Sequence, residues 1–88
     1  MKSIAQDQWP VLVASARTPF LDSAGAYSEL MSFELGAFAL RGLLQRVDLD
    51  PALIELVVMG TVLHEINTTN VAREAMLRAG LPATIPAY

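Results

Sequence analysis

Two short stretches of this sequence combine residue types that could bind or position a reactive group. Arg17-Thr18-Pro19-Phe20 follows an apolar run, and Asn70-Val71-Ala72-Arg73 opens a segment with helical spacing. An arginine at the end of a buried strand lies where open α/β sheets bind ligands, although it can also donate hydrogen bonds to loop carbonyls. Asn70 is a good helix N-cap, and Arg73 could reach a partner surface or remain a solvated charge. Residue chemistry alone favours the structural role at both stretches.

The chain lacks the residues that nucleophilic or metal-assisted catalysis needs. It has no cysteine, and none of its serines lies in the G-x-S-x-G turn that presents a nucleophile. Its one histidine, His64, could be a general base or a ligand, but no nucleophile or second ligand surrounds it, which favours a polar loop residue. Asp48 and Asp50 form a close acidic pair that we expect to end one helix and cap the next turn. We therefore expect no catalytic residue and no metal site.

The elements that must position these residues alternate between apolar runs and helical patterns. Continuous apolar runs at 10–16 and 56–60 predict strands buried on both faces, as in a parallel sheet. Between them, helical spacing predicts a helix over 32–47 with Ser32 as its N-cap. Asp50-Pro51 is predicted to cap a single further turn that runs through Glu55.

A second helix, over 71–79, has local signals at both ends. Asn70 is its predicted N-cap, Gly80 its left-handed terminating residue, and Leu81 is placed to contact Met76 in a Schellman motif. The remaining residues read as the approach to a third strand. This order of elements predicts an α/β fold with a parallel sheet. Residues 10–88 would be an incomplete part of it, because two strands alone are marginal, and residues 1–9 a flexible N-terminus.

The composition disfavours several classes of function. Hydrophobic residues make up 53% of the chain and charged residues 17%, compared with about 25% charged residues in ordinary domains. We therefore expect the chain to pack against more protein. Dispersed basic residues and a net charge of -3 argue against nucleic acid as a partner. No apolar run approaches the ~20 residues of a transmembrane helix, and the absence of cysteine and of an apolar leader favours a cytoplasmic or organelle-matrix location.

Over residues 10–88 the sequence resembles the N-terminal part of the thiolases, the acyl-CoA:acetyl-CoA acyltransferases. The stretch from Val11 to Phe20 carries the motif V-x-x-A-R-T-P-F, and later motifs follow in the family's order. These are Glu34-Leu35, Val57 to Leu63, Asn70-x-Ala72-Arg73, Ala79-Gly80-Leu81-Pro82 and Ile85-Pro86-Ala87. Many thiolases carry glycines directly after T-P-F, whereas here Leu21 follows. The loop from Leu21 to Tyr27, with His64-Glu65 and Thr69-Asn70-Val71-Ala72-Arg73, is most similar to the 3-ketoacyl-CoA thiolases, including trifunctional protein β subunits.

The resemblance implies a thiolase fold of two similar βαβαβαββ halves that cleaves 3-ketoacyl-CoA with CoA, or runs the reverse condensation, in fatty acid metabolism. It implies CoA and acyl-CoA as substrates, no bound cofactor, and a cytoplasmic or mitochondrial matrix location. The implied partners are the remainder of the thiolase chain, further copies in a dimer or tetramer, and a hydratase/dehydrogenase α subunit.

The family's nucleophilic cysteine follows P-A-Y within a handful of residues, so we expect this chain to stop before it and to be inactive alone. The resemblance would make Arg17, His64, Asn70 and Arg73 supports of the active site or an interface. His64 does not match the family's catalytic histidine.

Two other interpretations remain open from the sequence. The chain could be a non-catalytic truncated paralogue or assembly module with a thiolase-like fold. It could also belong to another condensing enzyme, such as a 3-ketoacyl synthase, because the cysteines and histidines that would decide lie outside these residues.

Overall fold

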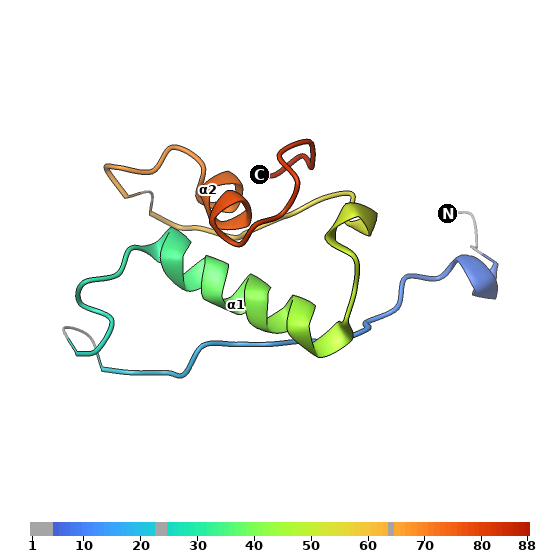
Figure 1. The fold of residues 1–88 in the computed structure, drawn as a ribbon, viewed down its shortest axis with the longest axis horizontal. Helices are drawn as coiled ribbons and strands as arrows, with labels where there is room; N and C mark the ends of the chain where they lie inside the picture. Colours follow the sequence, from blue (N-terminus) through green and yellow to red (C-terminus); the bar gives the residue numbers. More distant parts are fainter. Residues whose placement is uncertain (1–4, 23–24, 64) are drawn as a thin grey trace.

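A computed structural model of the chain describes residues 5–22, 25–63 and 65–88. In chain order its helices are η1 (Gln6–Gln8), α1 (Ser32–Val47), η2 (Pro51–Leu53) and α2 (Val71–Arg78). The predicted turn is η2, and the Asp50 carboxylate caps it by accepting from the Ala52 N–H at 3.0 Å. The segment 10–22 runs along one side of α1, and α2 lies on the other side (Figure 1). α1 is therefore the central element.

The start of α1 differs from the prediction, whereas its end does not. Met31 is the N-cap and makes no side-chain capping hydrogen bond, so the prediction of Ser32 as the N-cap is wrong. Ser32 is the first helical residue, and its backbone N–H donates to the Glu65 carboxylate at 2.9 Å. At the other end Asp48 is left-handed, with φ 50°, and its N–H donates to the Leu44 carbonyl at 3.0 Å. Asp48 ends the helix as predicted.

The boundaries of α2 follow the predicted local signals closely. Asn70 caps the helix through its side chain, as predicted. At the C-terminus Gly80 has φ +89°, and the Leu81 N–H donates to the Met76 carbonyl at 3.0 Å. This is the hydrogen bond of a Schellman motif. Leu81 and Met76 also share the same buried cluster, so the predicted motif is confirmed.

The core forms where α1 and α2 meet, and small residues bring the two helices close together. Ala72, Ala75 and Met76 of α2 are completely buried. A Cβ atom placed on Gly36 of α1 would lie 3.1 Å from the Ala75 Cβ and 3.0 Å from the Met59 Cε. Gly36 therefore allows a helix contact that a larger residue would hold apart.

The predicted strands do not form a sheet. Among the described residues no strand is present, and the sheet-type pairing consists of an isolated parallel bridge between Val57 and Ala87. Val57 is buried, but Leu12 in the middle of the first apolar run is 91% exposed. The prediction of a buried strand over 10–16 is therefore wrong for this chain. The physical reason is that strands are stabilised by neighbours, and the described residues give this run no backbone partner.

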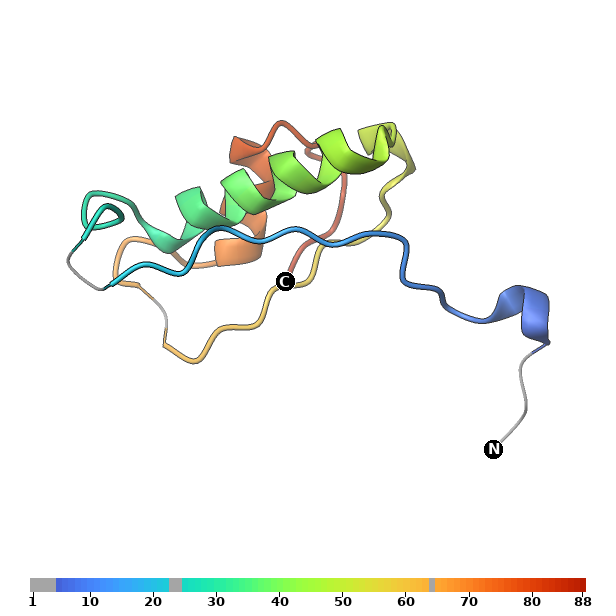
Figure 2. The same cartoon turned by 90° about the horizontal axis from the view of Figure 1, so that it is seen from below.

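The chain is also more open than a self-standing domain of its size. Its radius of gyration is 15.2 Å, whereas a compact domain of this length has about 12 Å. Its accessible surface is 7171 Å², against about 5000 Å² for a compact protein of this mass. η1 lies away from the helical body (Figure 2). Many large apolar side chains are exposed, including those of Val11, Leu12 and Val13, which is typical of a face that other protein covers.

Candidate functional site

Asn70, at the start of α2, forms hydrogen bonds through both the oxygen and the nitrogen of its side-chain amide. Its Oδ1 accepts from the backbone N–H of Arg73 at 3.0 Å, which is the predicted cap. Its Nδ2 donates to the backbone carbonyl of Ala87 at 3.1 Å, and the sequence did not predict this contact. One side chain therefore ties the first turn of α2 to the C-terminal segment.

Arg73 holds the same segment from one turn further along α2. Its Nη1 donates to the carbonyls of Ala83 at 2.7 Å and of Ile85 at 3.1 Å. The side chain is half-buried, so the alternative of a solvated charge is wrong. We refer to Asn70 and Arg73 together as the α2 clamp.

The opposite edge of the segment 83–88 is held by backbone hydrogen bonds. The Val57 N–H donates to the Pro86 carbonyl at 3.0 Å, and the Tyr88 N–H donates to the Val57 carbonyl at 3.1 Å. The Met59 N–H donates to the Tyr88 carbonyl at 3.0 Å. Successive residues of an extended chain direct their backbone groups to opposite edges. Residues 85–88 are thus fixed on both edges, by the α2 clamp and by residues 57–59, and the turn before them is closed by the bond from the Ile85 N–H to the Pro82 carbonyl.

Arg17 lies apart from the α2 clamp. The segment 10–22 that carries it runs on the side of α1 opposite α2 (Figure 1), so the structure does not bring these side chains together. The Arg17 guanidinium carbon lies 5.3 Å from the centre of the Phe20 ring, which is a cation–π distance. Arg46 of α1 ties this segment down, because its Nη1 donates to the Ser15 carbonyl at 3.0 Å.

His64 lies outside the described residues, so the prediction about it stays a prediction. Its neighbour Glu65 contacts the start of α1, where the carboxylate accepts from the Ser32 hydroxyl and from the Ser32 backbone N–H. These two hydrogen bonds, the hydroxyl first, hold the pKa of the Glu65 carboxyl below its ordinary value. Sequence reasoning missed this contact because the partners are 33 residues apart. The available signal was only that a helix N-terminus attracts carboxylates.

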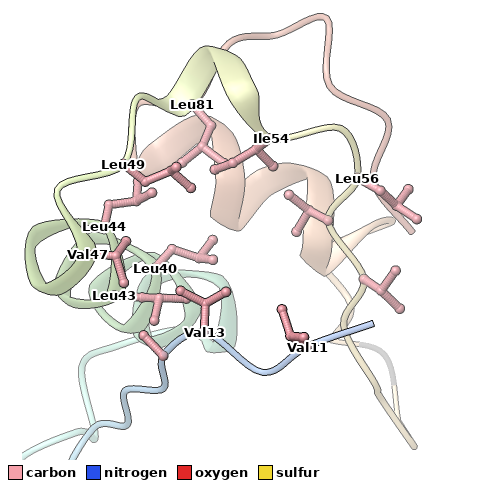
Figure 3. Close-up of a pocket in the computed structure, with 13 residues that line it drawn as sticks. Val11, Val13, Leu40, Leu43, Leu44, Val47, Leu49, Ile54, Leu56 and Leu81 are labelled. Atoms are coloured by element: carbon pink, nitrogen blue, oxygen red, sulfur yellow. The ribbon is translucent and has the colours of Figure 1, made fainter. Parts of the chain in front are cut away.

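An apolar groove of about 530 Å³ lies beside α1. Side chains from α1, from the first apolar run and from the chain around η2 surround its open centre (Figure 3). The lining consists of Val11, Val13, Ala14, Leu40, Leu43, Leu44, Val47, Leu49, Ile54, Leu56, Val57, Val58 and Leu81. None of these side chains can transfer a proton or attack a carbonyl, so the groove suits an apolar occupant and not a reacting group.

Residues 5–22, 25–63 and 65–88 contain no group of three or more His, Cys, Asp or Glu side chains that could hold a metal ion. Over the same ranges, no helix has both the length and the apolar character needed to cross a bilayer.

Comparison with known proteins gives consistent matches. Residues 10–88 match the family profile described as "Thiolase, N-terminal domain". The "Trifunctional enzyme subunit beta, mitochondrial" of Homo sapiens is 44% identical over 78 residues, covering 89% of this chain and 16% of the relative. A "Probable 3-ketoacyl-CoA thiolase" of Caenorhabditis elegans is 38% identical over 88 residues, covering 98% of this chain and 20% of the relative.

A bacterial relative shows the same pattern. The "Probable acetyl-CoA acyltransferase" of Staphylococcus aureus is 36% identical over 78 residues, covering 89% of this chain and 20% of the relative. The chain thus spans only 16% to 20% of the length of these curated relatives.

Proposed function

Since this chain belongs to the thiolase family, we propose that it is the N-terminal part of an acyltransferase that cleaves 3-ketoacyl-CoA with CoA, or runs the reverse condensation. The observation that carries the proposal is the match of residues 10–88 to the thiolase N-terminal domain. The relatives are named as a trifunctional enzyme β subunit, a 3-ketoacyl-CoA thiolase and an acetyl-CoA acyltransferase. The family resemblance found in the sequence is thereby confirmed.

In this proposal the present residues supply scaffold and the reacting groups lie elsewhere in the protein. Acyl transfer through a thioester needs a thiolate nucleophile and a site for the developing oxyanion. The chain has no cysteine, so the thiol must come from outside it. We place that thiol beyond Tyr88, after the segment that the α2 clamp holds. CoA and acyl-CoA are then the substrates of the whole enzyme.

We further propose that the rest of the enzyme completes an α/β thiolase fold around this part. In the complete protein the runs 10–16 and 56–60 would become neighbouring strands of a parallel sheet. The parallel pairing of Val57 with Ala87 supports a parallel strand at 56–60, with the C-terminal segment as one of its neighbours. The apolar groove also supports it, because a closed sheet would fill the groove with the side chains that the isolated chain exposes.

The proposed partners and location follow from the relatives. A trifunctional enzyme β subunit implies an α subunit, which we propose as a hydratase/dehydrogenase partner besides further copies in a dimer or tetramer. The location would be the mitochondrial matrix in a eukaryote and the cytoplasm in a bacterium. Arg17 and His64 are proposed as supports of an interface or of the active site, because each follows one of the two runs proposed as strands.

The test is an activity measurement on the full-length product of the gene. We expect CoA-dependent loss of the ketoacyl absorbance with the full-length protein, and none above the blank with residues 1–88 alone. The coding sequence should also place a cysteine at a helix start within about ten residues of Tyr88. A gene that ends at Tyr88 would leave an assembly module, and condensation without thiolysis would indicate a different condensing enzyme.

A further inference from the structure

We propose that Asn70 and Arg73 are positioning residues for acyl transfer, because they set the register and direction in which the chain leaves Tyr88. This inference rests on the proposed function, which places the reacting thiol just beyond that residue. Neither side chain is assigned any contact with substrate. Each acts through the backbone of the segment 83–88.

The α2 clamp replaces a neighbouring strand along one edge of residues 85–88. Two of the carbonyls that accept from it, those of Ile85 and Ala87, belong to alternating residues. The third, that of Ala83, lies in the preceding turn, which the Ile85 N–H closes by donating to the Pro82 carbonyl at 3.2 Å. The carbonyls of Pro86, between them, and of Tyr88, after them, accept from the other side, from the backbone of 57–59. Side-chain donors therefore satisfy one edge and backbone donors the other, so the edges are not interchangeable.

This arrangement opposes a shift of the segment along its own axis. A slip by one residue would turn the carbonyls of Pro86 and Tyr88 toward the α2 clamp and leave both sets of donors mismatched. The same slip would move Ile85 out of the core, where its side chain is 5% exposed. The Arg73 guanidinium bonds two carbonyls, and the Asn70 amide bonds the carbonyl of Ala87. Together these bonds specify one register of the segment.

The register of the segment determines where the residues that follow Tyr88 lie, and therefore where the proposed reacting thiol lies. Tyr88 lies one residue beyond the last carbonyl that the α2 clamp holds. A displacement there is passed directly to the atoms that follow, and a misplacement of about 1 Å at a reacting group can lower a rate about 100-fold. Loss of the clamp should therefore slow the reaction of bound substrate more than it weakens substrate binding.

The two functions of Asn70 can be separated by substitution. Asn70→Asp keeps an oxygen that caps α2, because aspartate and asparagine are similar N-caps. It removes the Nδ2 donor and leaves an oxygen facing the Ala87 carbonyl. Arg73→Lys keeps the positive charge but loses the planar fork that bridges two carbonyls. Arg78→Lys is the matched control: Arg78 is an exposed arginine of the same helix whose guanidinium lies over the Phe33 ring, 5.5 Å from its centre.

The experiment measures kcat and KM for CoA-dependent thiolysis in the full-length protein and in the three variants. It also measures the pH profile of iodoacetamide alkylation of the reacting cysteine. We expect Asn70→Asp and Arg73→Lys each to lower kcat about 10-fold or more, with KM changed less than about threefold. The alkylation profile should shift in both variants, and Arg78→Lys should match the wild type in every measurement.

Each outcome has one meaning. Wild-type kcat and alkylation profiles in both clamp variants of an active enzyme would overturn the positioning role and leave the proposed function intact. A fall in kcat with an equal rise in KM and a loss of the helical circular dichroism signal would also overturn the positioning role, because that pattern indicates general unfolding. A wild-type protein without thiolysis and without a reactive cysteine would instead refute the proposed function itself.

Discussion

The part of the chain from α2 to Tyr88 is held by many hydrogen bonds, whereas the segment 10–22 is held by few. α2 has a side-chain cap and a Schellman motif, and residues 85–88 are bonded to α2 on one edge and to residues 57–59 on the other. Between 10 and 22, the hydrogen bonds to the rest of the described chain include those from Arg46 to Ser15, from Tyr27 to Pro19 and from the Gly25 N–H to the Asp22 carbonyl, and the Arg17 guanidinium lies near the Phe20 ring. Yet this segment carries the more continuous apolar run. Hydrophobic sequence alone therefore does not establish burial.

The difference lies in where the stabilising partners come from. Caps and Schellman motifs use donors and acceptors within a few residues of each other, so a short chain contains them completely. A strand buried on both faces needs neighbouring strands and covering helices that can lie far away in the sequence. We infer that the apolar run 10–16 needs strand and helix partners that the described residues do not supply.

The largest expected effect contrasts the two regions directly. In the chain 1–88, Met76→Ala should lower the free energy of unfolding by about 2–5 kcal/mol, because it empties a completely buried site. Leu12→Ala should change that free energy by less than about 0.5 kcal/mol, because the side chain is exposed. Urea unfolding followed by helical circular dichroism measures both. Equal costs for the two variants would contradict the contrast.

A smaller effect separates two glycines of α1. Gly42→Ala should stabilise the chain by about 1 kcal/mol, because alanine favours the helix and nothing lies within 4 Å of the added Cβ. Gly36→Ala gains the same propensity but meets Ala75 and Met59, so it should be less stable than Gly42→Ala by about 1 kcal/mol or more. Urea unfolding of the matched pair tests this. Equal stabilities would show that the helices are not in close contact at Gly36.

The smallest effect concerns the contact between the loop and α1. The hydrogen bonds from Ser32 lower the pKa of the Glu65 carboxyl in the folded state. Their stabilisation is therefore present above the ordinary carboxyl pKa and is lost as the pH falls through the lowered one. The Ser32 amide signal in NMR should titrate with a midpoint below the ordinary pKa of a glutamate carboxyl. In Ser32→Ala the Glu65 midpoint should rise, and an unchanged midpoint would contradict the assignment of the cause.

Much of the local structure could be predicted from sequence. The Asn70 cap, the Gly80 terminus with its Leu81–Met76 pair, the Asp50 turn and the end of α1 all follow from residues close to one another. The start of α1 was predicted less well. A serine followed by an acidic residue favours an N-cap, but the distant Glu65 engages Ser32 instead.

The long-range contacts of the candidate site could not be predicted. Arg73 carries no sequence signal that its guanidinium would bridge the carbonyls of Ala83 and Ile85. The prediction of a buried strand over 10–16 was wrong because it also depends on distant partners, which the sequence of the run does not identify. Its residues have the composition of a buried strand, but composition does not say which chain will cover it.

Hydrogen exchange at the backbone amides of 11–16 tests the central claim most directly, by comparing the chain 1–88 with the full-length protein proposed here. We predict rapid exchange in the chain 1–88 and strong protection in the full-length protein, with Tyr88 protected in both because its N–H is bonded to Val57. Rapid exchange of 11–16 in both proteins would contradict the claim that the rest of a thiolase fold covers this run.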